Sequence, residues 1–463
     1  MEVGEIMEKY GVIVIGSGCG INIVNEALAH GLTVALVDKG PLGGTCANLG
    51  CIPSKMLIFA ADRIAEIQEA KKLGIEAEIK NIDFAFIMER MRKTVRESQE
   101  HMKQGLPYVE NLDFYEGEGH FVDDYTIEVN GKRIKGDKIF IASGSRPLIP
   151  AIKGLENIDY LTNETVLQLK ERPDSLIIIG GGYIAVEYGH FFAAMGTKVT
   201  ILEMADRLVL PEEPEISEML KKELSRRMDV YTGVQADAVK SNGHDLTVTV
   251  DDSKGGGRKE FTAQRVMVAV GRRSNADLLK VENTGVEVDK RGFVKVDEYL
   301  QTTKKNIFAV GDINGQQMFT HVANVEASLA ADNAIHSSKT KMDYSAAPHA
   351  IYSHPQIASV GMTEEAARKA HHVLIGRAKY WDVAQGEAMM EEDGFAKAIV
   401  EADTGKILGF HIIGPYAPIL IQEVINAMAS GGGIAQIQKG MHIHPSITEL
   451  VPQVLANLNS TTS

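Results

Sequence analysis

The chain has 463 residues, of which 44% are hydrophobic and 24% are charged, with 48 Lys and Arg against 62 Asp and Glu. This composition predicts a soluble globular protein of roughly two to four domains. The net charge of −14 argues against a nucleic-acid-binding protein, which needs basic surface to neutralise phosphates. Residues 1–11 lack the segments of a signal peptide, and no run approaches the about 20 apolar residues of a membrane span. We therefore expect a cytoplasmic, multidomain enzyme.

Two segments of the chain share one pattern. Each has a short apolar run, a glycine-rich turn, a helical stretch and a second apolar run that ends in an acid. They are VIVIGSGCGINIVNEALAHGLTVALVD (12–38) and LIIIGGGYIAVEYGHFFAAMGTKVTILE (176–203). Continuous apolar runs are typical of parallel strands that are buried on both faces. Each segment is therefore predicted to form a βαβ unit.

The rest of the chain alternates between helical and strand-like patterns. Helices are predicted at 54–73, 84–104, 213–228, 415–430 and 446–458. Strands are predicted within 113–150, at 265–271 and at 306–312, with a hairpin tip or loop at 251–260. Residues 344–463 mix strands (AIYSH, AKAIVEA, KILGFHIIG) with helices, and so predict a separate α+β domain. Candidate domain boundaries lie near 147–154 and 272–277.

The second glycine turn reads GGGYIA (180–185), and the acid that follows it is Glu203. Such a turn between strand and helix lets backbone N–H groups approach a pyrophosphate, while the acid binds a ribose 2′-hydroxyl. A carboxylate repels a 2′-phosphate, so NAD is favoured over NADP. Arg207 is the feature that opposes this preference, because a cation close to Glu203 attracts a 2′-phosphate.

The first glycine turn reads GSGCGI (16–21), and its acid is Asp38. Ile21 stands where Gly or Ala normally permits close packing of helix on strand, which is a departure from the usual pattern. Two copies of the pattern nevertheless predict two dinucleotide sites. Cys19 within this turn is interpreted as a bystander.

A cysteine pair occurs in GGTCANLGCIPSK (43–55), where four residues separate Cys46 from Cys51. A disulfide that closes so short a loop stabilises a fold little, whereas thiols near a helix N-terminus are suited to exchange. Only three cysteines occur in the chain, which excludes a secreted disulfide scaffold. Two buried thiols or half of a zinc site are the alternatives, but no second cysteine pair exists to complete four zinc ligands.

Together with the two glycine turns, this cysteine segment resembles the pyridine nucleotide–disulfide oxidoreductases, flavoenzymes that include dihydrolipoamide dehydrogenase and glutathione reductase. The resemblance covers essentially the whole chain. It extends to KIFIASGSRP (138–147, with Ser143 for the usual threonine), RVMVAVGRRSN (265–275), TTKKNIFAVGD (302–312) and MHIHPSITE (441–449, with Ser446 for threonine).

The resemblance implies an α/β fold with two Rossmann-like dinucleotide-binding domains and a C-terminal α+β dimerisation domain. The implied FAD-binding domain comprises 1–150 and 273–343, the NAD-binding domain 151–272, and the dimerisation domain 344–463. FAD and NAD are the implied cofactors. The implied homodimer brings His444 and Glu449 to the partner subunit's disulfide, with no nucleic-acid or membrane partner.

Roles for individual residues also follow from the resemblance. The implied catalytic residues are Cys46, Cys51, His444, Glu449, Lys55 and Glu187, with the last two paired beside the flavin. The implied cofactor contacts are Gly16, Gly18, Asp38, Gly44, Thr45, Lys55, Gly119, Ser143, Gly144, Asp312, Thr320, Gly180, Gly182, Tyr183, Ile184, Glu203 and Gly271. Tyr183 would cover the nicotinamide pocket, His442 is interpreted as structural, and no metal ligand is expected.

Within the family, Glu203 and GGGYI favour an oxidation of dihydrolipoamide by NAD. GSGCGINIV and HIHPSITELV favour instead a mycothione reductase-like enzyme that reduces another low-molecular-weight disulfide. Mercuric reductase and the large thioredoxin reductases are disfavoured because the C-terminal NLNSTTS has no cysteine. A nucleotide-binding sensor or assembly subunit without turnover is disfavoured by the intact set of catalytic residues.

Overall fold

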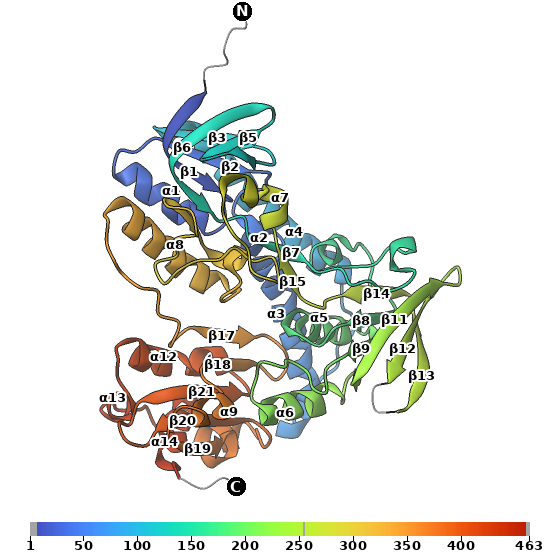
Figure 1. Ribbon diagram of the computed structural model, residues 1–463. Helices are drawn as coiled ribbons and strands as arrows, with labels where there is room; N and C mark the ends of the chain where they lie inside the picture. The colour runs from blue at the N-terminus through green and yellow to red at the C-terminus, as the bar shows by residue number, and fades with distance from the viewer. Residues whose placement is uncertain (1–6, 253–254, 460–463) are drawn as a thin grey trace, which may run out of the picture. The chain divides into compact units, whose positions relative to one another are not determined.

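The structure is a computed structural model that describes residues 7–252 and 255–459 (Figure 1). The expectations for residues 1–6, 253–254 and 460–463 therefore lie outside the described residues. The chain divides into two compact units of three segments each. Unit 1 comprises Met1–Ser54, Glu89–Leu148 and Gly271–Met342, and unit 2 comprises Lys55–Met88, Ile149–Val270 and Asp343–Ser463.

Unit 1 is built on a seven-stranded sheet. Its strands are β1 (Glu8–Ile15), β2 (Val34–Asp38), β3 (Leu112–Glu116), β4 (His120–Asp123), β5 (Thr126–Val129), β6 (Lys132–Ile141) and β16 (Ile307–Ala309). The order is β3-β2-β1-β6-β5-β4, and β16 pairs with the second half of β6. β1, β2, β3, β6 and β16 pair in parallel, whereas β4 and β5 are antiparallel additions at one edge. A short ribbon of β7 (Ser145–Pro147) and β15 (Arg272–Ser274) completes the strands of this unit.

Helices α1 (Gly20–Ala29) and α8 (Thr320–Ile335) lie side by side on the sheet of unit 1 (Figure 1). Their contact is made of small and β-branched side chains, since Ile23 and Ala27 share one buried cluster with Ala327 and Ala331. Small side chains let two helix backbones approach closely, so this pair is rigidly packed. Helices α2 (Gly44–Asn48) and α7 (Ala276–Leu279) also belong to this unit. The divisions between the units fall within two further helices, since α3 (Cys51–Glu69) begins in unit 1 and continues into unit 2, and α4 (Phe84–Gly105) begins in unit 2 and continues into unit 1.

Unit 2 contains a parallel sheet and an antiparallel sheet in its middle segment. The parallel strands are β8 (Ser175–Ile179), β9 (Lys198–Glu203), β10 (Asp229–Thr232) and β14 (Arg265–Val268), in the order β10-β9-β8-β14. The antiparallel strands are β11 (Val234–Ser241), β12 (Leu246–Asp252) and β13 (Gly257–Ala263). Helices α5 (Tyr183–Ala194) and α6 (Pro214–Leu224) follow β8 and β9, and α5 is buried along most of its length.

The last segment of unit 2 forms a five-stranded antiparallel sheet. Its strands are β17 (Pro348–Ile351), β18 (Ile357–Gly361), β19 (Val373–Lys379), β20 (Phe395–Glu401) and β21 (Ile407–Ile413), in the order β17-β18-β21-β20-β19. Its helices are α9 (Glu364–Arg368), α10 (Ala384–Ala388), α11 (Ala417–Leu420), α12 (Gln422–Ala429), α13 (Ile434–Gln438) and α14 (Leu450–Ala456). Sheet and helices share a core that includes Phe410, Val424 and Leu450.

The predicted mixed α/β architecture is confirmed, and both glycine turns lie in parallel βαβ units. The prediction of a loop over 251–260 is too long, because β12 continues to Asp252 and β13 starts at Gly257. The predicted helix at 415–430 is two short helices, α11 and α12. β18 and β19 were not predicted, because each carries a glycine and neither shows a simple alternation of polar and apolar residues.

The close contact between helix and strand in the first glycine turn is made by Gly20. A Cβ atom on Gly20 would lie 2.8 Å from Cγ1 of Val14 and 3.3 Å from Cβ of Ala142, distances that force a neighbour to move. Ile21 is only half-buried. The residue that permits close packing therefore stands one position earlier than the usual pattern places it, which accounts for the departure at Ile21.

We expect Gly20→Ala to lower the free energy of unfolding of the FAD-loaded protein by about 1–3 kcal/mol, the usual cost of overpacking a buried contact. Gly105→Ala is the matched control, because Gly105 ends α4 with φ −74° and an added Cβ would meet nothing within 4 Å. Denaturant titrations of both variants measure the difference. Equal midpoints for the two variants would contradict the packing argument.

Candidate active site

Two contacts fix the conformation of the first glycine turn, one with the backbone of Ala142 and one with the carboxylate of Asp38. Gly16 has φ +106°, and a Cβ there would lie 2.2 Å from the carbonyl oxygen of Ala142, so only glycine fits. The carboxylate of Asp38 accepts a hydrogen bond from the backbone N–H of Ser17 at 2.6 Å. The turn therefore enters α1 in a fixed conformation, with Asp38 at the carboxyl end of β2.

The cysteine segment packs directly on this turn. A Cβ on Gly44 would lie 2.7 Å from Cα of Gly18, so the two backbones are in contact. The side-chain amide of Asn48 lies 2.8 Å from the carbonyl oxygens of Leu42 and Gly44, and Gln99 from α4 donates to its Oδ1 at 2.8 Å. Asn48 and Gln99 were not identified from the sequence, because their shared role appears only when α4 meets this loop. Thr45, also predicted as a cofactor contact, is exposed on α2.

Cys46 and Cys51 are thiols in this structure, Cys46 in α2 and Cys51 at the start of α3. The hydrogen bond with the Cys51 thiol, together with burial, raises the pKa of Cys46, while a hydrogen bond with Thr320 opposes this rise. Thr320 starts α8, and its Oγ1 lies 3.5 Å from Sγ of Cys51. The pair thus forms a hydrogen-bonded dithiol in which Cys46 holds its proton.

Cys19 is not part of this pair. Burial and the nearby carboxylates of Glu326 and Asp312 raise the pKa of its thiol to about 12, so it is protonated at neutral pH. A protonated, half-buried thiol is a poor nucleophile.

A second polar group in unit 1 surrounds Asp312. The Ser145 hydroxyl donates to Oδ2 of Asp312 at 2.5 Å, and Arg272 donates to Ser145 Oγ at 2.7 Å. The hydroxyl of Ser143 is buried and has no hydrogen-bond partner within the described residues. Such an orphaned buried hydroxyl needs a polar partner that the chain does not supply.

Three predicted glycine contacts in unit 1 differ in their surroundings. A Cβ on Gly144 or on Gly271 would meet nothing within 4 Å, so both leave open space. A Cβ on Gly119 would lie 2.7 Å from Cγ1 of Val37, so packing against β2 explains this glycine. The open space at Gly144, the turn at Gly16 and Gly18 and the orphaned hydroxyl of Ser143 together fit FAD in unit 1.

The second glycine turn lies between β8 and α5 in unit 2. Gly180 has φ +114°, and a Cβ there would lie 2.3 Å from the carbonyl oxygen of Ala269, as in the first turn. Gly182 is exposed, and a Cβ on it would meet nothing within 4 Å. Tyr183 and Ile184 then start α5, and the carboxylate of Glu203 accepts from the backbone N–H of Ala205 at 2.6 Å. The open N-terminus of α5 with an acid at the end of β9 fits NAD.

Tyr183 is held by a buried acid that the sequence did not reveal. Its hydroxyl donates to Oε1 of Glu212 at 3.2 Å, and its ring stacks on His349 with 5.6 Å between ring centres. Nε2 of His349 lies 2.5 Å from the same carboxylate oxygen. Burial and the charge of Glu212 raise the pKa of Tyr183, so its hydroxyl is protonated at neutral pH.

Lys55 and Glu187 form the ion pair that the sequence predicted. Lys55 Nζ lies 2.8 Å from Oε2 of Glu187, and Oε1 of Glu187 accepts from the backbone N–H of Tyr352 at 2.9 Å. The ammonium also lies 4.8 Å from the centre of the Tyr352 ring. Both carboxylate oxygens are therefore satisfied, and the ammonium is fixed at the second turn of α3.

His444 and Glu449 form a dyad on the surface of unit 2. His444 Nδ1 lies 2.9 Å from Oε1 of Glu449, and Oε2 of that carboxylate accepts from the backbone N–H of Ser446 at 3.1 Å. The hydrogen bond from His444 lowers the pKa of Glu449. The imidazole is 72% exposed, so the dyad presents an oriented ring to an external group. His442 is paired separately, with Glu423 at 3.0 Å.

Family models match nearly the whole chain. Residues 10–327 match the model of the pyridine nucleotide-disulphide oxidoreductases, and residues 347–455 match the dimerisation domain of the same group. No helix among the described residues is long and apolar enough to cross a membrane.

Curated relatives carry three different enzyme names. The chain is 36% identical over 463 residues to a dihydrolipoyl dehydrogenase of Geobacillus stearothermophilus, covering 97% of this chain and 96% of the relative. It is 34% identical over 468 residues to a mycothione reductase of Mycobacterium tuberculosis, covering 98% and 100%. It is 34% identical over 425 residues to a mercuric reductase of Staphylococcus aureus, covering 91% and 77%.

A solved structure has the same fold. The flavoprotein disulfide reductase RclA from Escherichia coli, in a Cu(II) complex, superposes with a TM-score of 0.86 at 27% identity, covering 97% of this chain and 99% of that one. The resemblance inferred from the motifs is thus confirmed. The chain belongs to the pyridine nucleotide-disulphide oxidoreductase family, whose members use FAD and a nicotinamide dinucleotide.

Proposed function

We propose that this flavoprotein disulfide oxidoreductase passes electrons between a dithiol substrate, with dihydrolipoamide as the first choice, and NAD. The observation that carries the proposal is the hydrogen-bonded pair formed by Cys46 in α2 and Cys51 at the start of α3. FAD, when bound, would take the electron pair from the dithiol and pass it on as a hydride. The proposed FAD-binding domain is 1–150 with 273–343, the NAD-binding domain 151–272, and the dimerisation domain 344–463.

The proposed exchange starts from the oxidised cysteine pair. One thiolate of the substrate attacks Sγ of Cys46, which breaks the bond to Cys51 and leaves Cys51 as a thiolate. The second substrate thiol gives its proton to His444 of the partner subunit and attacks the substrate sulfur of the mixed disulfide, which breaks the bond of that sulfur to Cys46 and leaves Cys46 as a thiolate. The substrate leaves as its disulfide, and its two electrons remain on the cysteine pair.

In the reverse direction, in which the enzyme reduces a disulfide, Cys46 is the attacking thiol, and its raised pKa explains why this step needs a base. A thiol that holds its proton attacks slowly, since only the thiolate is nucleophilic. An imidazole oriented by a carboxylate is a common proton acceptor near neutral pH. We propose that the dyad of His444 and Glu449 serves this role for the cysteine pair of the partner subunit.

The remaining predicted residues would act on the cofactors. Lys55, oriented by Glu187, would place a cation beside the flavin and so favour an anionic reduced form. Tyr183, held by Glu212, would cover the nicotinamide pocket. Asp312 and the orphaned hydroxyl of Ser143 would bind the flavin portion of FAD, and Asp38 its ribose.

A second candidate function is the reduction of a different low-molecular-weight disulfide by a nicotinamide dinucleotide. The full-length similarity to a mycothione reductase favours it, because that relative is matched over 98% of this chain and all of its own. The same cysteine pair and the same dyad would serve both reactions, run in opposite directions. Steady-state rates with lipoamide and with several low-molecular-weight disulfides distinguish the two.

We expect NADH to be used about 100-fold more efficiently than NADPH, since a carboxylate within a few ångströms repels a phosphate by a few kcal/mol. Glu203→Ala should narrow the ratio of the two kcat/KM values, whereas Asp206→Ala, an exposed acid of the same loop, should leave it unchanged. Steady-state assays with both nucleotides measure the ratio. Equal efficiencies in the unmodified enzyme would contradict the role of Glu203.

A further inference from the structure

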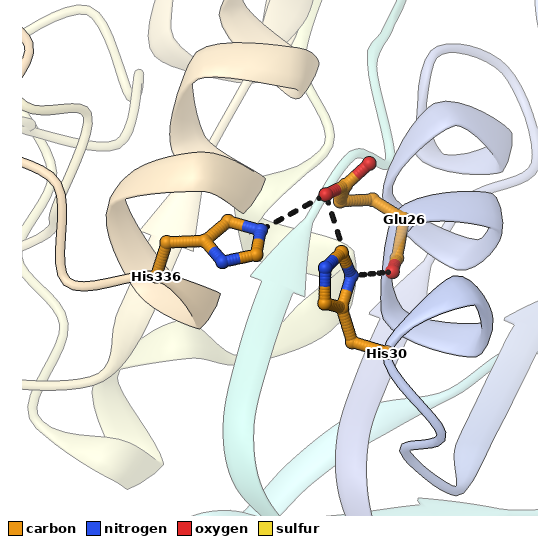
Figure 2. Close-up of side chains that lie close together, drawn as sticks. All are labelled: Glu26, His30 and His336. Carbon is orange, nitrogen blue, oxygen red and sulfur yellow. Dashed lines mark hydrogen bonds and ion pairs between the residues drawn. The ribbon is translucent and has the colours of Figure 1, made fainter.

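Three side chains with metal-binding donors meet where α1 and α8 end, away from the residues discussed so far (Figure 2). Glu26 lies in the last turn of α1, His30 caps its C-terminus, and His336 caps the C-terminus of α8. Nε2 of His336 lies 3.1 Å from Oε1 of Glu26, and Nδ1 of His30 lies 3.4 Å from the same oxygen. The two imidazole rings stand edge to face with 4.3 Å between their centres.

The distances match the spacing of ligands around one small ion. In a tetrahedral zinc site with bonds of about 2.0–2.1 Å, neighbouring ligand atoms lie about 3.3 Å apart. The separations of His336 Nε2 and His30 Nδ1 from Glu26 Oε1, 3.1 and 3.4 Å, lie on either side of that value. All three donor atoms lie within 4.8 Å of one another. Nδ1 of His30 also lies 2.9 Å from the backbone carbonyl oxygen of Glu26, a hydrogen bond that the ring would give up to bind the ion (Figure 2).

The electrostatic setting favours a cation. The C-terminus of a helix carries a partial negative charge of about half an elementary charge, and here two such ends meet beside one carboxylate. Neither α1 nor α8 has a basic residue in its last turn. Within the described residues, the ion-pair partners of Glu26 are the two histidines alone. The negative charge at this point is therefore not balanced by a lysine or arginine.

The described residues contain two other groups of three side chains with metal-binding atoms, but in both groups a cation of the chain balances the negative charge. Beside Asp62, His190 and His354, the guanidinium of Arg227 lies 3.2 Å from Nδ1 of His190. In the group of three carboxylates, Glu213, Glu215 and Glu364, the ammonium of Lys397 lies 2.7–2.8 Å from each. A cation of the chain already occupies each of these groups.

The backbone that carries the three side chains is held in place. Ala27 of α1 packs in the same buried cluster as Ala330 and Ala331 of α8, within two helical turns of His30 and His336. Asn22 of α1 donates to Asn324 of α8 at 3.3 Å, which adds a polar link farther along the pair. The donors are thus presented by rigid elements, and binding would require movement of side chains alone.

We propose that Glu26, His30 and His336 form a binding site for a divalent transition-metal ion of the zinc class, which joins the C-terminal ends of α1 and α8. Two imidazoles and one carboxylate are borderline ligands that suit such ions better than Mg²⁺ or Ca²⁺. The three protein donors leave a fourth position for water or a solute. The bound ion stabilises unit 1 because it binds the folded arrangement of the two helices and not the unfolded chain.

Calorimetric titration with Zn²⁺ tests this site in the FAD-loaded protein, stripped of metals with a chelator and kept oxidised so that Cys46 and Cys51 form a disulfide. We expect one ion per chain in the unmodified protein. His30→Gln and His336→Gln should each weaken Zn²⁺ binding by about 100-fold. Even the loss of a residue that only hydrogen-bonds to a metal ligand lowers metal affinity by about 10- to 100-fold. Saturating Zn²⁺ should raise the melting temperature of the unmodified protein and of neither variant.

His244→Gln is the matched control. His244 is an exposed histidine whose Nδ1 lies 3.0 Å from Asp245, so it offers a carboxylate and one imidazole without a second ring. Zn²⁺ binding should be unchanged in this variant. The proposal is wrong if oxidised protein binds no Zn²⁺, or if His30→Gln and His336→Gln bind it as tightly as the unmodified protein. Binding seen only after reduction of the cysteines, and equal in both variants, would place the ion on thiols and also overturn the proposal.

Discussion

The Cys46→Ser variant should lose disulfide turnover by about 10⁵-fold while it keeps its FAD, the order of loss seen when the residue that forms the covalent intermediate is removed from an enzyme. Serine cannot form the mixed disulfide, whereas Cys51 keeps its position at the N-terminus of α3, where helix N–H groups favour a negative charge. We therefore expect the variant to retain a long-wavelength absorbance band that requires a thiolate beside the oxidised flavin. Stopped-flow absorbance and steady-state assays measure the two properties.

Two further substitutions separate this role from a structural one. Cys51→Ser should lose both turnover and the absorbance band, because Cys51 supplies the thiolate in the proposed exchange. Cys19→Ser should retain both, since the high pKa of Cys19 keeps it protonated. Loss of FAD from Cys46→Ser would indicate that Cys46 is a structural cysteine. An absorbance band that survives in Cys51→Ser would mean that Cys46 supplies the thiolate and Cys51 forms the mixed disulfide.

His444→Gln should reduce turnover of the disulfide by about 10²- to 10⁴-fold, the usual contribution of a general base. Glutamine can still donate to Glu449, so the dyad keeps its shape while it loses the group that accepts a proton. Reduction of the flavin by NADH involves no substrate thiol, so this step should stay near the rate of the unmodified enzyme. Stopped-flow reduction and steady-state turnover, measured on the same preparation, distinguish the two steps.

His442→Gln is the control for this prediction, because His442 lies two residues away and is also paired with a glutamate, Glu423 at 3.0 Å. We expect little change in turnover for this variant. A similar loss in both variants would assign the effect to the fold of the C-terminal segment. Unchanged turnover in His444→Gln would refute the dyad as the base.

Much of the candidate site could be predicted because its parts are local in sequence. A glycine turn, its helix and its acid lie within about 30 residues of one another in a βαβ unit, so spacing alone identifies them. The cysteine pair lies on one short loop, and His444 and Glu449 are five residues apart. Side chains this close in the chain meet for local reasons, whatever the rest of the fold does.

Contacts between distant segments could not be predicted in the same way. Thr320 lies 269 residues after Cys51, yet its hydroxyl is 3.5 Å from the thiol. Thr320 was expected to contact a cofactor, and its contact with Cys51 became evident only in the structure. Glu212, Gln99 and the backbone N–H of Tyr352 were not identified at all, because no local pattern marks a residue whose partner lies on another element.

The sequence by itself determined the family, the two glycine turns, the cysteine pair and the histidine dyad, since each is a short run of residues with its own chemistry. Tertiary structure decided which glycine packs α1 on its strand, because that depends on the distance from Gly20 to Val14. It also brought Glu26, His30 and His336 together, since His336 is 310 residues from Glu26. Packing of α1 against α8, which no local pattern encodes, is the physical reason that these three side chains meet.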